Sequence, residues 1–167
     1  LGMPGIRTGI IVAREDIIEA YASANGIINL ACGNMGPAIV QEMFRSGEIL
    51  DLTRKHITPF YRQRAMDTVD WFRDSLGDVP CRIHKPEGAF FLWLWFEGLP
   101  ISSAELYQRL KQRGVLVVPG HHCFFGLEEE WPHRHECIRV SYVQDEKSVR
   151  KGVAIICDEA RRVFSEA

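Results

Sequence analysis

Apolar and polar positions follow a helical period in the second half of the chain. Between residues 59 and 76 the apolar side chains recur at spacings of three, four and seven, which predicts a long amphipathic helix. The same period between residues 145 and 164 predicts a closing helix. A shorter periodic segment over 103–113 ends at Gly114 and predicts a helix between these two.

Short runs between these helices have the pattern of strands. Residues 138–143 alternate between apolar and polar side chains, whereas residues 89–96 are apolar on both faces. The segments predicted as strands are 81–85, 89–96, 115–118 and 138–143. The order strand, strand, helix, strand, strand, helix predicts a small α+β layer, with helices packed on one face of a mixed sheet.

The first part of the chain has a different pattern. A β-rich run at 8–13 predicts a buried strand, and the acidic residues that follow it fit the first turn of a helix reaching residue 24. A second helix is predicted from Pro37 to about residue 46, since proline is favoured in a first helical turn. We place a domain boundary at about residue 60, in or near the long helix.

Composition and charge exclude several kinds of partner. With 167 residues, 46% of them apolar, the chain can form one substantial core, or one domain and a piece of another. A net charge of −2 gives no electrostatic basis for binding nucleic acid or an anionic membrane. No apolar run approaches the ~20 residues that span a bilayer, and the start of the chain does not resemble a signal peptide.

The cysteines indicate the cellular compartment. They are odd in number and scattered, which predicts reduced, mostly structural thiols in a cytoplasmic protein and no disulfide framework. The five are Cys32, Cys81, Cys123, Cys137 and Cys157. Position 1 is Leu rather than Met, which suggests a fragment or a processed chain.

Arg7 is the first candidate for binding chemistry. It lies in the segment Pro-Gly-Ile-Arg-Thr-Gly at 4–9. A planar guanidinium beside a Gly/Pro turn can donate two parallel charge-assisted hydrogen bonds to a phosphate, and glycine lets the backbone approach the ligand. From the spacing alone, the alternative is a surface turn that happens to contain an arginine.

Arg139 is the second candidate. In the predicted strand it points away from the face that Ile138 and Val140 share, which places a cation on a sheet with limited access to water. Such a charge requires a carboxylate, and its planar fork matches one bidentately. The carboxylate can belong to a substrate or to an internal Asp or Glu, and the strand alone does not decide between them.

Histidines and cysteines near the predicted strands raise the possibility of a metal site, because imidazole and thiolate suit zinc. The residues concerned are His121, His122, Cys123, His133, His135 and Cys137. Their spacing lacks the paired knuckles of a structural zinc site, so we assign no metal. The aromatic run that contains Trp93 and Trp95 is predicted to be core rather than a cofactor-stacking surface.

Four segments, in order along the chain, together resemble the class I and II aminotransferases of the fold-type I pyridoxal phosphate enzymes. They are Pro-Gly-Ile-Arg-Thr-Gly at 4–9, Pro-Glu-Gly-Ala-Phe-Phe-Leu-Trp at 86–93, Gly-Val-Leu-Val-Val-Pro-Gly at 114–120 and Cys-Ile-Arg-Val-Ser-Tyr at 137–142. The resemblance covers essentially the whole chain and implies the C-terminal portion of an α/β fold. Residues 1–59 would be the end of the large cofactor-binding domain, and residues 60–167 the small α+β domain.

The resemblance also implies roles for individual residues. The lysine that holds pyridoxal 5'-phosphate as a Schiff base would immediately precede Leu1, so no catalytic residue lies in the chain and the chain alone would be inactive. Arg7 would hold the cofactor phosphate, and Arg139 would hold the α-carboxylate of small amino acid and 2-oxo acid substrates in a ping-pong reaction. His121 and His122 would lie in a loop bordering the active site. A homodimer is implied as well.

Within the family, residues 1–9, 33–38 and 119–126 are most similar to bacterial members that transfer an amino group from valine to pyruvate. This reaction gives 3-methyl-2-oxobutanoate and alanine and belongs to amino acid biosynthesis. One alternative is an alanine or aromatic aminotransferase of the same fold. Another is a noncatalytic module, either the ligand-binding part of an aminotransferase-like regulator or a dimerisation domain.

Overall fold

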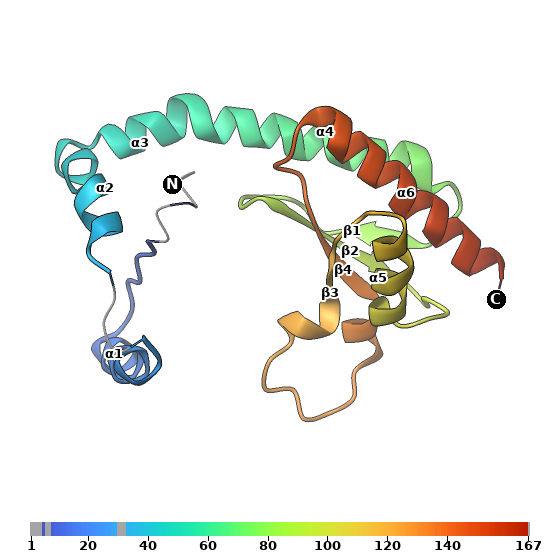
Figure 1. Ribbon diagram of the computed structural model, residues 1–167, viewed down its shortest axis with the longest axis horizontal. Coiled ribbons are helices and arrows are strands. Elements are labelled where there is room, and N and C mark those ends of the chain that lie inside the picture. Colours follow the sequence, from blue (N-terminus) through green and yellow to red (C-terminus); the bar gives the residue numbers. More distant parts are fainter. Residues whose placement is uncertain (1–4, 6–7, 30–32, 167) are drawn as a thin grey trace. The chain divides into compact units, whose positions relative to one another are not determined.

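The chain divides into two compact units, Leu1–Pro59 and Phe60–Ala167, in the computed structural model (Figure 1). The structure describes residue 5, residues 8–29 and residues 33–166. Among these residues, no helix combines the length and the hydropathy that crossing a bilayer requires.

The first unit consists of helices. α1 (Glu15–Asn29) carries Glu15 and Asp16 in its first turn, where carboxylates offset the positive end of the helix dipole. α2 (Met35–Ser46) ends at Gly47, whose left-handed backbone (φ 77°) stops the helix and leads into α3 (Glu48–Leu52). A π-helical turn, Thr53–Ile57, follows α3.

The strand predicted at 8–13 is wrong. Residues 8–14 have no regular secondary structure, and the apolar side chains of Ile10, Ile11 and Val12 are exposed. A buried-type strand is stable only between hydrogen-bonded neighbours with both faces covered. The described part of the first unit contains no other strand that could supply them.

The second unit is built on a four-stranded sheet. Its strands are β1 (Cys81–Ile83), β2 (Phe91–Phe96), β3 (Val118–Pro119) and β4 (Cys137–Ser141), in the spatial order β1-β2-β4-β3. The sheet was expected to be mixed, but every pair of neighbouring strands is antiparallel. β2 and β4 are adjacent although α5 and β3 separate them in the sequence, and strand patterns alone do not give this pairing.

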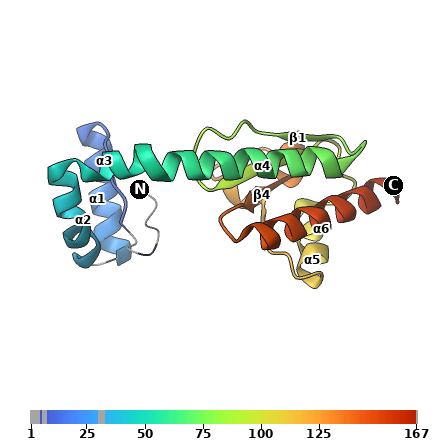
Figure 2. The ribbon, with the colours of Figure 1, turned by 90° about the horizontal axis from the view of Figure 1, so that it is seen from above.

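Helices cover one face of the sheet. α4 (Thr58–Leu76) and α6 (Glu146–Ser165) are linked by Arg64, which donates to the carbonyl of Gln144, and lie side by side (Figure 2). α5 (Ser103–Gln112) contributes Leu106 and Leu110 to the same core. The backbone amide of Glu105 donates to Ser102 Oγ (3.2 Å), which caps the start of α5.

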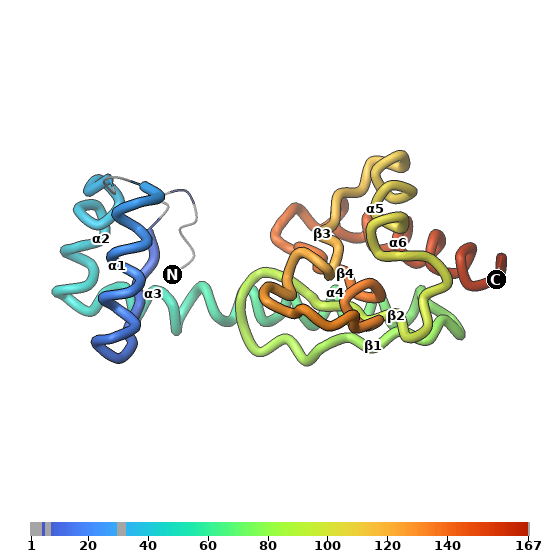
Figure 3. Tube along the Cα trace, turned by 90° about the horizontal axis from the view of Figure 1, so that it is seen from below, coloured from blue at the N-terminus to red at the C-terminus, as the bar shows by residue number. Residues whose placement is uncertain are grey.

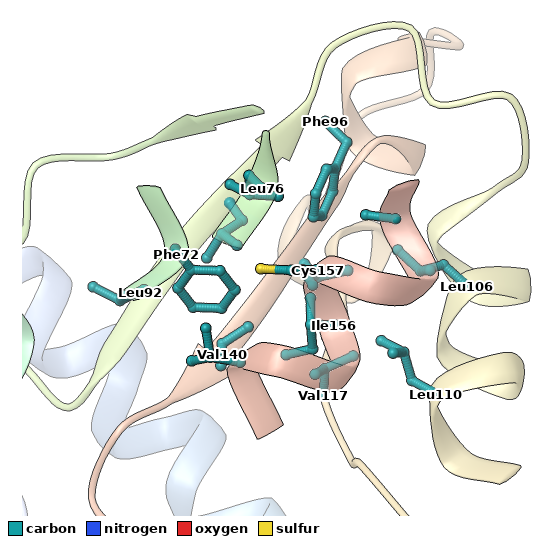
Figure 4. Packing of buried hydrophobic residues seen from close by; sticks show 14 of the residues in the cluster. Phe72, Leu76, Leu92, Phe96, Leu106, Leu110, Val117, Val140, Ile156 and Cys157 are labelled. Atoms are coloured by element: carbon teal, nitrogen blue, oxygen red, sulfur yellow. The ribbon is translucent and has the colours of Figure 1, made fainter. Parts of the chain in front are cut away.

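The core follows from the alternation of side chains in β2 and β4. Leu92, Leu94 and Phe96 of β2 are completely buried and pack with Phe72 of α4 and Cys157 of α6 (Figure 4). The intervening residues of β2 point to the other face of the sheet. The two tryptophans predicted as core are therefore half-buried on that second face rather than packed in the main core.

Candidate functional site

The second face of the sheet carries the polar and aromatic side chains of β2 and β4. Arg139, on β4, lies opposite Trp93 of β2 in one ladder and opposite Val118 of β3 in the other. Residues paired in this way point to the same face. The arginine predicted to lie away from the core face is therefore at the centre of the second face, between two strands.

Arg139 contacts an aromatic ring and no acidic side chain. Its Cζ lies over the Phe91 ring, 4.3 Å from the centroid. The Nε atom is buried without a hydrogen-bond partner, and Arg139 forms no ion pair with any residue that the structure describes. An internal salt bridge to this arginine, one of the two possibilities left by the strand pattern, is absent from the described part of the chain. A buried N–H donor without a partner fits an external acceptor such as a carboxylate.

A segment between β3 and β4 packs against the second face (Figure 3). It begins and ends with 3₁₀ turns, Gly120–Cys123 and Pro132–His135. A Cβ at Gly120 would approach the carbonyl oxygens of Arg134 and Cys137 to 2.8 Å, so only glycine fits at this position. The His133 ring stacks on Trp131 at 4.5 Å and lies edge-on to Trp95 at 4.7 Å, which fixes the end of the segment.

A pocket of about 430 Å³ lies between α5 and the β3 edge. Its polar lining comes from Tyr107, Gln108, His121 and His122, and its apolar lining includes Val118, the ladder partner of Arg139. The two histidines predicted to border the active site are therefore together at this pocket. Arg139 is on the neighbouring strand and is not a lining residue.

The electrostatic surroundings of His121 keep it neutral. Burial, followed by the nearby His122, His135 and Arg134, lowers the pKa of His121 below its ordinary value of 6.5. The Nδ1 atom is buried without a hydrogen-bond partner among the described residues. The imidazole is therefore uncharged at neutral pH and can act as a donor or an acceptor toward a ligand.

The arrangement of histidine and cysteine does not favour a metal. Among the described residues, no three His, Cys, Asp or Glu side chains are grouped so that they could hold an ion. Cys137 Sγ lies 3.5 Å from His133 Nε2, but burial raises the pKa of this thiol to about 12. These two side chains are fewer than the three or four protein ligands of a zinc site.

Residues 1–156 match the family described as aminotransferase class I and II. The chain belongs to this aminotransferase family. This match confirms the family that the four sequence segments predicted. The roles predicted for single residues stay predictions.

Relatives of this aminotransferase chain are similar over its full length. It is 50% identical over all 167 residues to the valine–pyruvate aminotransferase of Escherichia coli K12, of which it spans 40%. The crystal structure of valine-pyruvate aminotransferase AvtA from Salmonella typhimurium LT2 is 50% identical, with a TM-score of 0.84 over 99% of this chain and 43% of that one. A putative amino-acid aminotransferase from Psychrobacter arcticum 273-4 is 43% identical, with a TM-score of 0.85 over 99% of this chain and 38% of that one. The chain thus spans about two fifths of the length of these relatives.

Of the two arginines predicted to bind ligands, only Arg139 lies in the part of the chain that the structure describes. Arg139 is described, and its surroundings suit a carboxylate. Arg7 lies outside the described residues. Phe91 was not singled out from the sequence, because it was one aromatic residue in an apolar run. Its offset of two from Trp93, which lies opposite Arg139, places it diagonally across from that arginine once the pairing is known.

Proposed function

We propose that this chain is the C-terminal part of a pyridoxal phosphate enzyme that transfers an amino group from valine to pyruvate, giving 3-methyl-2-oxobutanoate and alanine. The observation that carries the proposal is Arg139, which has a buried donor without a partner on a sheet face where no described acid neutralises it. The 50% identity to two valine–pyruvate aminotransferases supports this choice of substrates.

Arg139 binds the α-carboxylate that both substrates share. Its planar fork donates two parallel hydrogen bonds to a carboxylate, which fixes the orientation of the substrate as well as its affinity. One arginine serves both half-reactions, because the amino acid and the 2-oxo acid carry the same carboxylate. Lysine would supply the charge without the fork.

Small apolar substrates agree with the composition of the neighbouring pocket. None of its lining residues is a lysine or an arginine, and His121 is neutral. We propose that the substrate side chain enters this pocket, where a second, distal carboxylate would find no lysine or arginine among the lining residues. Valine, alanine and pyruvate have no such group.

The cofactor supplies the electron sink that makes the Cα proton of the amino acid acidic. Of the residues that the resemblance assigns to it, Arg7 would hold the phosphate, and the Schiff-base lysine would precede Leu1. The described residues include neither group. The part they play in the reaction is to bind and orient the substrate through Arg139.

The remaining assignments belong to the same proposal. Residues 1–59 form the end of the large domain and residues 60–167 the small domain. The full-length enzyme is a cytoplasmic homodimer of amino acid biosynthesis, and the 167-residue chain alone does not transaminate. Nucleic acid and membranes are not partners.

Two measurements on the full-length enzyme test the proposal. Borohydride reduction followed by mass mapping is expected to find a phosphopyridoxyl group on a lysine immediately before Leu1. In an assay with L-valine and pyruvate, Arg139→Leu is expected to raise KM for both substrates about 100-fold. The variant Arg150→Leu removes an arginine that lies on α6 instead of on the sheet, and it serves as a control with KM unchanged.

Other results would exclude the proposal in distinct ways. A strong preference for alanine or an aromatic amino acid as amino donor would overturn the proposed substrates, while the protein would still be an aminotransferase. Absence of cofactor uptake would favour the noncatalytic module. An unchanged KM in Arg139→Leu would show that another group binds the carboxylate.

A further inference from the structure

The guanidinium of Arg139 is held by one aromatic ring. Phe91 lies on β2 and faces Ser141, so it is the diagonal neighbour of Arg139 on the same sheet face. The Cζ of Arg139 lies 4.3 Å from the centroid of the Phe91 ring, within the range of a cation–π contact. Among the described residues, no second ring lies against this guanidinium and no carboxylate forms an ion pair with it.

The backbone before Phe91 is itself fixed to the end of β4. Tyr142 Oη donates to the carbonyl of Ala89 (2.8 Å), and the Tyr142 amide donates to the carbonyl of Phe90 (3.3 Å). Tyr142 is almost completely buried. Ala89 adopts a left-handed backbone (φ 61°), which is rare for a residue with a Cβ. The strained turn and the two hydrogen bonds therefore determine where β2 begins and where the Phe91 ring lies.

We propose that Phe91 is a positioning residue that holds the Arg139 guanidinium in place for the substrate carboxylate. An acidic neighbour would also position the arginine, but it would occupy the N–H donors and compete with the substrate. A ring face attracts the cation without accepting a full hydrogen bond from those donors. Phe91 thus orders the arginine and leaves its fork available. This inference rests on the proposed role of Arg139.

Kinetics of Phe91 variants in the full-length holoenzyme test this role. Phe91→Leu is expected to raise KM for valine and for pyruvate about fivefold, with kcat and cofactor content unchanged. Phe91→Tyr retains a ring face and is expected to keep KM within about twofold of the original. Because Phe91 is 41% exposed, these substitutions leave the buried core intact, which a thermal melt of each variant verifies.

The chain offers a matched control. Trp71 of α4 makes the same kind of contact with Arg150 of α6, at 4.2 Å, away from the second face of the sheet. Trp71→Leu removes a cation–π contact of similar geometry and is expected to leave both KM values unchanged. An equal rise in KM for Trp71→Leu would mean that the effect comes from general loosening of the unit, and it would overturn the inference.

A double substitution separates this inference from the proposed function. If Phe91 acts through Arg139, then Phe91→Leu has no further effect on kcat/KM in the Arg139→Leu background. A fivefold loss in both backgrounds would mean that Phe91 acts independently of Arg139, and an unchanged KM in Phe91→Leu alone would also overturn the inference. Failure of the proposed function gives a different result, namely an unchanged KM in Arg139→Leu.

Discussion

Burial controls the reactivity of three thiols in the second unit. It raises the pKa of Cys81 and Cys137 to about 12 and that of Cys157 to about 11. Because the thiolate is the nucleophile, we expect iodoacetamide to alkylate these three more than ~100-fold more slowly in the folded chain than in urea at pH 8. Mass mapping after timed quenching measures each site, and the partly exposed Cys123 is the internal comparison. Rapid alkylation of Cys137 in the folded chain would contradict the buried position on β4.

The neutral state of His121 gives a pH dependence with a definite sign. Its pKa is lowered by folding, so the unfolded chain binds more protons than the folded chain below about pH 6.5. The His121 contribution therefore makes the unit less stable as the pH falls from about 7 to 5. Deuterium exchange at the imidazole C2 position, followed by mass spectrometry across pH, measures this pKa directly. A midpoint at or above 6.5 would contradict the burial of the ring, and His121→Asn is expected to reduce the slope of stability against pH.

The site could be predicted from the sequence only as far as single-strand alternation reaches. Alternation in one strand was enough to place Arg139 away from Ile138 and Val140. The contact with Phe91 depends on the pairing of β2 with β4, across 40 intervening residues, and periodicity contains no information on that register. The absence of an acidic partner likewise became visible only from the packed structure.

At the scale of elements, a buried carboxylate joins α5 to α6. Glu159 of α6 is 2% exposed, and its Oε2 lies 2.9 Å from Arg113 Nη1 at the end of α5. Glu159→Gln leaves arginines without their buried counter-charge, so we expect a loss of about 2 kcal/mol in the free energy of unfolding. Urea unfolding of the chain followed by circular dichroism measures it.

An exposed acid on α5 is the matched control for this change. Glu105 contacts Arg109 at 3.1 Å, but about half of its side chain is exposed. Glu105→Gln is expected to leave the unfolding midpoint unchanged within error, because exposed ion pairs contribute little. Equal losses for both variants would show that burial of Glu159 is not what makes its contact stabilising.

Helices were more predictable than strands because their signal is local. The predicted helices at 59–76 and 145–164 match α4 and α6 to within one residue at each end, since each has a continuous apolar stripe that meets one core. The run at 8–13 has the composition of a strand, yet a strand depends on neighbours that composition does not reveal. The prediction of a mixed sheet was wrong for the same reason, because strand direction depends on which strands pair.

At the scale of the whole molecule, the hydrophobic core is unevenly distributed. Every residue of the main buried cluster lies between Ala65 and Val163, in the second unit. In the first unit, the helices bury only Gly36, Val40 and Ile49 among their described residues. The side chains of Ile27 and Ile28 keep about 80% of their surface accessible to solvent. Folding free energy from apolar burial is therefore concentrated after residue 60.

This distribution predicts that the second unit folds without the first. A polypeptide of residues 58–167 contains all of α4, the sheet and both other helices, so it is expected to unfold cooperatively in urea with a single transition. Limited trypsin digestion of the 167-residue chain is expected to cut first after Arg14 and Arg45 and to leave a resistant C-terminal fragment, because the early segments have little buried surface to lose on opening. Mass spectrometry of the surviving fragment locates the cuts. Early cleavage within α6, or a non-cooperative transition for residues 58–167, would show that the second unit needs contacts from outside it. The buried cluster would then be insufficient to hold Arg139 and its neighbours in place.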